Sequence, residues 1–344
     1  MTCGDKTTGA IWTALLLSTS LALGRAGEAD KPYVHLNKVA AKLEKGVLVT
    51  GLYVSSMDPS NALGLVNSNG WQAGEEVFTK PAIDFVLVEM EHEPYDLEKL
   101  RLFLLALNSR REVYRKGNRQ PNIVTFVNMP MAGGEPMKTY VKQVLDLGVH
   151  GLKMPMVQTA EQAREFIQAC RYPQARGSKL AEPQGRRSFY PLWASYLWGL
   201  SENEYRERAD LWPLNPKGDL MAFVHIEDKL GVENIEEILD VPGIAGVTFG
   251  PQDYSFSIGL PNQTSHPEVR AAWQRVKRAC GRRNIPFIMW ADETNIDERI
   301  AEGYRMLIIG SDTNTDLGEG PRYGNRGPGK VLDILRERQG RANR

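Results

Sequence analysis

The sequence predicts an α/β protein that folds as one (β/α)₈ TIM barrel of parallel strands. Short apolar runs alternate along the chain with segments of helical periodicity. Several of these runs end in acidic or polar residues, which is typical of a site at the carboxyl ends of parallel strands. A doubly wound open sheet is the alternative fold, but the chain has no GxGxxG motif or P-loop to support a nucleotide there.

The predicted strands are short and strongly apolar, as parallel strands buried on both faces should be. In chain order they occupy residues 46–54, 84–90, 122–130, 151–154, 222–227, 245–253, 286–292 and 305–310. Because apolar runs of this length alternate with helical segments, a barrel is favoured over a sandwich.

Helical segments are predicted between these strands, and several have recognisable ends. Asp58-Pro59 places proline at a first helical position, Thr159 and Gln162 form a capping box, and Gly148 stands where a C-terminal cap belongs. The helical segments are 36–44, from 59, from 96, 137–145, 159–170, 232–239, 267–280 and a last one that contains Val331, Leu332 and Leu335.

The N-terminus has the pattern of a secretory signal peptide. Lys6 precedes a mostly apolar run over residues 10–23, which is followed by small residues around Ala26. We therefore expect a signal peptide over residues 1–29, a single catalytic domain over 30–344 and a secreted or periplasmic protein. If the segment is an uncleaved anchor or a wrong start, the protein is cytoplasmic or anchored instead. We expect no membrane span in the mature chain.

Composition excludes several classes of partner and site. Lys and Arg number 42, as do Asp and Glu, so we expect neither a nucleic-acid nor an anionic-membrane partner. The three cysteines, Cys3, Cys170 and Cys280, have no zinc spacing and cannot form a disulfide framework.

Residues 171–220 form the longest interruption of the strand–helix pattern. The segment is rich in aromatic residues, which include Tyr190, Trp193, Tyr196, Trp198, Tyr205 and Trp212. We expect either a lid or subunit contact, since Trp and Tyr anchor interfaces, or packing of the segment against its own domain.

Two acidic residues follow neighbouring predicted strands. The run 222–227 ends at Glu227 and the run 245–253 ends at Asp253, with a helical segment between them. The carboxyl ends of adjacent parallel strands meet at one edge, so the two carboxylates should converge. Hard oxygen ligands suit Mg²⁺ or Mn²⁺, although two solvated acids in ordinary loops remain the simpler alternative.

Four motifs at the predicted strand ends resemble the HpcH/HpaI aldolase family of metal-dependent class II aldolases. They are VEMEHEPYD (88–96), GLKMPMVQTAEQAREFIQACRYP (151–173), HIE (225–227) and GPQDYSFSIGLP (250–261). The resemblance implies a TIM barrel, often a homo-oligomer (a trimer or hexamer), with a divalent ion bound by Glu227 and Asp253. It also implies a pyruvate-type 2-oxo acid and an aldehyde as substrates, and a base histidine at His92.

The chemistry implied by the resemblance accounts for these residue types. Enolisation of a 2-oxo acid builds negative charge on the keto oxygen, which a divalent ion stabilises. Histidine changes charge near neutral pH, so His92 can move protons, with Glu91 or Glu89 orienting the imidazole. Backbone groups around Pro251 and Gln252 could hold the donor carboxylate, and Pro155 ends the fourth predicted strand beside it.

The chain departs from the family pattern at three positions. Asn128 stands where the family usually has an arginine, and a neutral amide forms weaker hydrogen bonds to an oxyanion. We expect Lys153 to point into the barrel mouth and to replace that charge in part, although a lysine that reaches out past the wall is the alternative. His225 replaces a glutamine: it is either a third metal ligand, which would favour Mn²⁺, Co²⁺ or Zn²⁺, or a partner that orients Glu227.

Three rival functions remain open at this stage. One is a class I aldolase in which Lys153 forms a Schiff base. Another is a related lyase or hydrolase that uses the same metal site on a different acid. The third is a secreted binding protein that has lost turnover, against which the presence of Glu227, Asp253 and His92 together argues.

Overall fold

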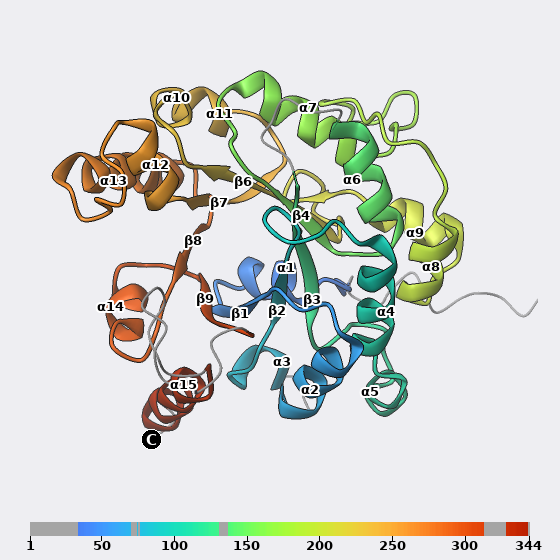
Figure 1. Ribbon diagram of the computed structural model, residues 1–344. Coiled ribbons are helices and arrows are strands. Elements are labelled where there is room, and N and C mark those ends of the chain that lie inside the picture. Colours follow the sequence, from blue (N-terminus) through green and yellow to red (C-terminus); the bar gives the residue numbers. More distant parts are fainter. Residues whose placement is uncertain (1–33, 70–73, 75, 131–136, 313–327, 343–344) are drawn as a thin grey trace, which may run out of the picture. The chain divides into compact units, whose positions relative to one another are not determined.

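The computed structural model describes residues 34–69, 74, 76–130, 137–312 and 328–342, which form a (β/α)₈ TIM barrel (Figure 1). The predicted fold is confirmed. The predicted signal peptide (1–29) and most of the loop before the last helix lie outside the described residues. No helix in the described ranges is long and apolar enough to span a membrane.

The barrel closes through parallel pairing alone. Strands follow one another in the order β4-β3-β2-β1-β9-β8-β7-β6, and β4 pairs with β6 to complete the ring. The short β5 pairs only with the start of β6. The strands are β1 (Val49–Val54), β2 (Phe85–Glu89), β3 (Val124–Asn128), β4 (Gly151–Met154), β5 (Leu211–Trp212), β6 (Leu220–Ile226), β7 (Ile244–Phe249), β8 (Phe287–Trp290) and β9 (Met306–Ser311).

Helices surround the strands and cover their outer faces (Figure 1). They are α1 (Lys38–Glu44), α2 (Pro59–Asn69), α3 (Glu76–Thr79), α4 (Leu97–Leu107), α5 (Arg110–Lys116), α6 (Met137–Asp146), α7 (Ala160–Cys170), α8 (Leu192–Trp198), α9 (Glu202–Arg208), α10 (Lys229–Glu233), α11 (Ile235–Leu239), α12 (Pro251–Ser257), α13 (Pro267–Arg282), α14 (Ile296–Ala301) and α15 (Pro328–Ala342).

The structure confirms the three helix ends that the sequence marks with a specific residue pattern. Pro59 is the first residue of α2, and the Thr159–Gln162 capping box at the start of α7 is formed in both directions. Gly148 has φ +91°, the left-handed conformation of a helix C-cap. These signals depend on local hydrogen bonds, which the nearby sequence specifies.

Several segments differ from the predicted pattern. The helix predicted over 232–239 is two short helices, α10 and α11, which meet at Asn234. The seventh run does not continue as strand to Asp253: β7 ends at Phe249, and Asp253 lies in the first turn of α12. In the first two cases a turn follows directly on an apolar run, so periodicity gave no boundary. The helices α3, α5, α8, α9 and α14 and the short strand β5 have no counterpart among the predicted segments.

Two apolar clusters hold the barrel together. One lies between the strands and the surrounding helices, and the other fills the barrel interior. In the interior, the ring of Phe126 packs against those of Phe85 and Phe223, with centroids 5.5 Å and 4.9 Å apart. Burial of aromatic side chains this size stabilises the barrel by about 2 kcal/mol or more each. The interior is therefore a packed core, and a ligand has access only at its ends.

The aromatic segment 171–220 packs at the amino-terminal ends of the strands, away from their carboxyl ends. Trp198 stacks on His150, with centroids 4.6 Å apart, and its indole N–H donates to the Gly148 carbonyl at 2.7 Å. Tyr205 is fully buried. These contacts agree with packing of the segment against its own domain.

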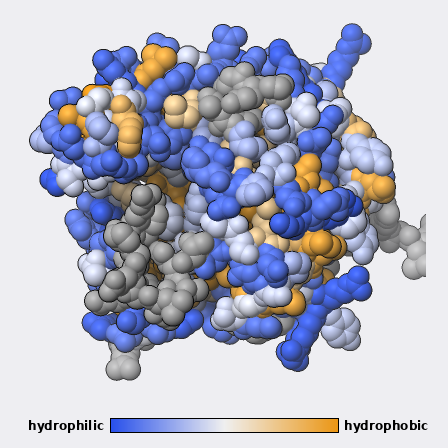
Figure 2. Space-filling view, in the orientation of Figure 1, coloured by the Kyte–Doolittle hydropathy of each residue, from blue (hydrophilic) through white to orange (hydrophobic). Residues whose placement is uncertain are grey.

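Some aromatic side chains of the same segment remain exposed. Tyr190 and Tyr196 are 68% and 59% exposed, and Leu192 between them is 57% exposed. Figure 2 shows hydrophobic side chains gathered on this side of the molecule, over α4 and α8. An intersubunit contact of this segment therefore stays a prediction.

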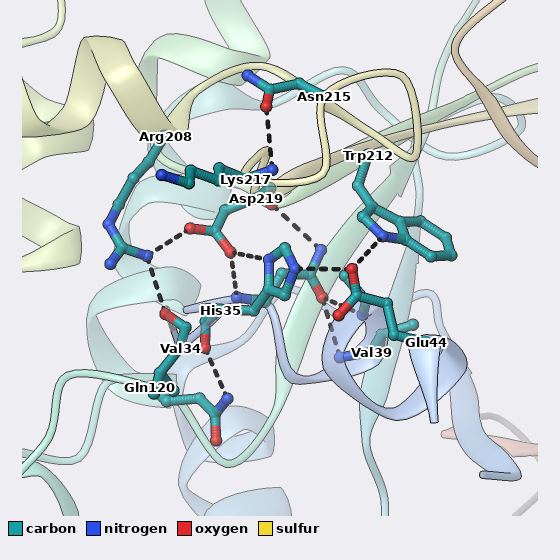
Figure 3. Close-up of polar contacts among 12 residues, drawn as sticks. Val34, His35, Val39, Glu44, Gln120, Arg208, Trp212, Asn215, Lys217 and Asp219 are labelled. Carbon is teal, nitrogen blue, oxygen red and sulfur yellow. Dashed lines mark hydrogen bonds and ion pairs between the residues drawn. The ribbon is translucent and has the colours of Figure 1, made fainter. Parts of the chain in front are cut away.

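A polar cluster fixes the start of the described chain to the amino-terminal end of the barrel (Figure 3). His35 Nδ1 lies 2.9 Å from Asp219 Oδ1, and its Nε2 lies 3.2 Å from Glu44 Oε1. Arg208 donates to the other Asp219 oxygen at 2.8 Å, and Trp212 Nε1 donates to Glu44 at 3.0 Å. The cluster thus ties the first described residues to α1, α9 and the start of β6.

Candidate active site

The barrel interior changes from apolar to polar at the carboxyl ends of its strands. Along β2, the inward-facing positions are Phe85, Leu87 and Glu89, since alternate residues face the same side. Asn128 ends the same series on β3, and Lys153 on β4 pairs with it in register. Each apolar layer inside the barrel is covered by another layer of side chains on both sides. The last layer, at the carboxyl ends of the strands, has no layer above it, so it can hold polar groups. We call this last layer the mouth.

Glu89 organises one side of the mouth. One of its oxygens accepts from Asn128 Nδ2 at 2.7 Å and from the Tyr53 hydroxyl. The other accepts from the backbone N–H groups of Glu91 at 2.5 Å and His92 at 2.8 Å. Glu89 therefore fixes the turn that presents Glu91 and His92.

The side-chain amide of Asn128 donates hydrogen bonds to two carboxylates. Its amide nitrogen lies 2.7 Å from Glu89 Oε2 and 2.8 Å from Glu91 Oε2, while its buried Oδ1 accepts no hydrogen bond from a described residue. Burial raises the pKa of Glu91, although Lys153 and the Asn128 amide oppose the shift. The Asn128 amide is thus engaged by Glu89 and Glu91, and it adds no charge to the mouth.

Lys153, His225 and Glu227 form a chain on the other side of the mouth. Lys153 is only 5% exposed, and its Nζ lies 3.1 Å from His225 Nδ1. The same Nδ1 lies 3.2 Å from Glu227 Oε2. Lys153 therefore points into the mouth and does not reach past the barrel wall.

Burial dominates the ionisation of these three groups. It holds the pKa of His225 well below its usual range, with Lys153 and His92 adding to the effect, so the imidazole is neutral at neutral pH. Burial also lowers the pKa of Lys153, against the opposing field of Glu227, Glu91, Glu89 and Asp253. Burial raises the pKa of Glu227 to about 8, with Lys153 opposing the shift. A neutral His225 offers either a donor or an acceptor at Nδ1, so it can bond Glu227 or Lys153 but not both.

A strained turn after β4 also contacts Glu227. Met156, which follows Pro155, has φ +52°, in the left-handed region that non-glycine residues rarely occupy. Its N–H donates to Glu227 Oε1 at 2.7 Å. Non-glycine residues in this region cost about 1 kcal/mol or more, and such strain gathers at functional sites. Pro155 itself is buried beside this turn and donates no hydrogen bond.

Gly250 lets the start of α12 approach Glu227. A Cβ at this position would lie 2.7 Å from Glu227 Cβ and 2.9 Å from both Glu227 Oε2 and His225 Nε2. Asp253 follows in the first turn of α12, where its exposed carboxylate forms no hydrogen bond or ion pair with the described residues. The glycine therefore leaves room for Glu227 and His225 beside the turn that carries Asp253.

The remaining candidates lie at the edge of the mouth. The His92 side chain is 75% exposed, and its Nε2 lies 3.8 Å from Glu91 Oε1. The Gln252 amide donates to Asn262. Since Pro251 has no N–H and the Gly250 N–H donates to the Ile226 carbonyl, Gln252 and Asp253 supply the available backbone donors of this turn.

The donor set fits a divalent cation that prefers oxygen. Four carboxylates, those of Glu89, Glu91, Glu227 and Asp253, act electrostatically on the single ammonium group of Lys153. Among the described residues, no three or more His, Cys, Asp or Glu side chains stand ready as a metal cluster. Two carboxylates with open positions for substrate oxygens are nevertheless a common arrangement for Mg²⁺. His225 Nδ1 lies 3.2 Å from Glu227 Oε2, and its role as a third ligand or as the residue that orients Glu227 stays a prediction.

Comparison with known proteins shows the family of this chain. The family model for HpcH/HpaI aldolase/citrate lyase matches residues 71–317. The chain belongs to the HpcH/HpaI aldolase/citrate lyase family. It is 31% identical over 281 residues to 2-keto-3-deoxy-L-rhamnonate aldolase of Escherichia coli K12, covering 80% of this chain and 88% of the relative. It is 29% identical over 279 residues to hydroxypyruvate/pyruvate aldolase of Roseobacter denitrificans, covering 80% and 91%.

Solved structures agree on the fold of this HpcH/HpaI chain. A family protein from Burkholderia cenocepacia J2315 superposes with a TM-score of 0.62 at 21% identity, covering 89% of this chain and 98% of that one. The curated homologues are aldolases, so the relatives of this chain are carbon–carbon lyases.

Sequence patterns did not identify every residue in the mouth of this HpcH/HpaI chain. Tyr53 lies in the middle of an apolar strand, and its contact with Glu89 joins residues 36 positions apart. Met156 contributes only a backbone N–H, which leaves no trace in a side-chain motif. For Tyr53, the available signal was a hydroxyl at an inward position of a strand that ends at the mouth.

Proposed function

We propose that this protein is a metal-dependent aldolase that cleaves or forms a 4-hydroxy-2-oxo acid through the enolate of a pyruvate-type donor. The observation that carries the proposal is the buried Glu227 carboxylate, held by the Met156 N–H beside the exposed Asp253 of α12. These two carboxylates would hold Mg²⁺ or Mn²⁺. The ion would stabilise negative charge on the keto oxygen of the donor.

The side chains of the mouth would divide the remaining work. His92, exposed at the edge, would move the proton at the donor methyl carbon, with Glu91 orienting its imidazole. The backbone N–H groups of Gln252 and Asp253 would bind the donor carboxylate. Lys153 would supply positive charge near the keto oxygen, because the amide of Asn128 is engaged by Glu89 and Glu91.

Proton–deuterium exchange into the methyl group of pyruvate tests the donor half-reaction without knowledge of the aldehyde. We expect exchange with Mg²⁺ or Mn²⁺, loss of exchange in EDTA, and loss in Asp253→Ala. Asp240→Ala, another exposed acid, should behave like the parent protein. If metal binds and pyruvate shows no exchange, the donor is a different acid and the aldolase assignment is wrong.

Imine chemistry at Lys153 is the second candidate. Burial lowers the pKa of this amine, as nucleophilic lysines require, and it lies in the mouth. Reduction with borohydride in the presence of pyruvate would attach the donor covalently to Lys153 and would leave Lys153→Met unlabelled. Exchange that persists in EDTA, together with such labelling, would favour imine formation over the metal-dependent route.

We also propose, from the sequence, that residues 1–29 are removed on secretion and that the mature protein is a homo-oligomer. Determination of the N-terminus of the protein isolated from its natural source tests the first point. Light scattering on the mature protein tests the second, since a trimer or hexamer differs from a monomer at least threefold in mass.

A further inference from the structure

A basic pocket lies on the outside of the barrel, away from the mouth. It has a volume of about 100 Å³ and lies between the first turns of α6, the end of α7 and the segment 186–188. Six of its lining residues have N–H or O–H donors on their side chains: Lys138, Thr139, Lys142, Arg186, Arg187 and Ser188. Among the described residues that line it, none is acidic and none belongs to the mouth.

Arg187 forms the buried wall of this pocket. Its side chain is 0% exposed, and its Nη2 donates to Asp146 Oδ1 at 2.7 Å and to the Tyr205 hydroxyl at 3.2 Å. Its guanidinium lies over the ring of Tyr172, 4.4 Å from the centroid. Its Nε and Nη1 are buried and have no acceptor among the described residues. A buried guanidinium whose donors are only partly used is unusual, because each unsatisfied group costs free energy.

The other three cations of the pocket, Lys138, Lys142 and Arg186, form no side-chain hydrogen bond or ion pair with the part of the chain that the structure describes. The charge of Lys142 nevertheless acts on Asp146, the acid that pairs with Arg187. Lys138 and Lys142 are one helical turn apart on α6, so their ammonium groups face the same side. A bound anion would relieve the repulsion among the three cations that form no ion pair.

We propose that this pocket binds a phosphate group, either free or carried by a small metabolite. A tetrahedral oxyanion offers enough acceptor oxygens to bond several of the converging ammonium, guanidinium and hydroxyl donors at once. The site is separate from the mouth, so the proposal does not depend on the proposed function.

The experiment measures binding of inorganic phosphate, sulfate, acetate and glycerol phosphate to the purified protein by calorimetry. EDTA is present, and chloride keeps the ionic strength constant. We expect saturable binding of phosphate and weak or absent binding of acetate. Tighter binding of glycerol phosphate than of inorganic phosphate would identify a phosphorylated metabolite as the ligand, and equal binding would identify the free ion.

A pair of double variants separates this pocket from general attraction to positive charge. Lys138→Gln with Lys142→Gln should weaken phosphate binding by about tenfold or more. Arg110→Gln with Arg111→Gln removes two exposed charges from α5 and should leave binding unchanged. Absence of saturable phosphate binding, or equal binding by both double variants, overturns the proposal. Both variants alter exposed or half-exposed side chains, and their thermal unfolding verifies that they fold.

Discussion

The ammonium nitrogen of Lys153 lies 3.1 Å from Nδ1 of His225, two residues that stand 72 positions apart in the chain. The contact exists because β4 and β6 are neighbours in the barrel and both side chains face its interior. Through His225, which lies 3.2 Å from Glu227, the lysine is connected to a candidate metal ligand. Replacement of any of these residues should therefore alter the properties of the others.

Lys153→Met should impair the donor reaction while the protein stays folded. Methionine has a similar length but no charge, so it removes the cation that we place near the keto oxygen. We expect exchange into pyruvate to fall roughly tenfold to a hundredfold, with a higher KM, because a charge-assisted contact is worth on the order of 1.5–3 kcal/mol. Full activity with an unchanged KM would show that Lys153 has no part in the reaction. Lys99→Met on α4 is the control.

Gly250→Ala should disturb the metal site more than the fold. The added methyl group would lie 2.7 Å from Glu227 Cβ and 2.9 Å from His225 Nε2, so it pushes α12 away from Glu227. We expect Mn²⁺ affinity to fall by about tenfold or more, measured by calorimetry. Gly281→Ala in α13, where a methyl group meets nothing within 4 Å, should bind metal normally and be slightly more stable. Normal metal affinity in Gly250→Ala would contradict a site at Glu227.

His150 should make the protein less stable in mild acid. Burial lowers its pKa from 6.5 to about 4, with the charge of Asp219 opposing the shift. Between these values the unfolded chain binds more protons than the folded one. The free energy of unfolding therefore falls as the pH decreases from about 6.5 to about 4, by up to about 3 kcal/mol.

Comparison with His150→Phe isolates this contribution. Phenylalanine can keep the stacking on Trp198 and cannot be protonated. Urea unfolding at several pH values should show a flatter acid limb for the variant. Parallel curves for the two proteins would assign the acid sensitivity to other groups.

His35 should stabilise the protein more in mild acid than in alkali, which is the opposite of the effect of His150. Burial disfavours its protonation, but its contacts with Asp219 and Glu44 prevail and raise its pKa above 6.5 (Figure 3). Its stabilising effect is therefore complete below the unfolded pKa and is lost as the pH rises through the folded pKa. We expect His35→Gln to destabilise the protein more at about pH 6 than at about pH 9 in urea unfolding. An equal loss at both pH values would mean that the hydrogen bonds, and not the charge, matter.

The sequence predicted the barrel because its eight ring strands and the main helices between them are encoded locally. Alternation of apolar runs with helical periodicity gave the β/α order, and the capping box at Thr159 marked its helix start correctly. The sequence predicted element boundaries less well where a turn follows an apolar run directly. Asp253 was predicted to end a strand, but it lies in α12. The division of 232–239 into α10 and α11 was missed for the same reason.

By itself, the sequence determined the fold class and the family, and it singled out Glu227, Asp253 and His92 as candidates, because motifs keep their residue types in chain order. Only the tertiary structure decided that Lys153 faces His225, that Glu89 fixes the His92 turn through backbone N–H groups, and that Gly250 brings α12 close to Glu227. Such relationships join residues from different strands. They depend on barrel closure, which sets the register and spacing of strands that are distant in the chain.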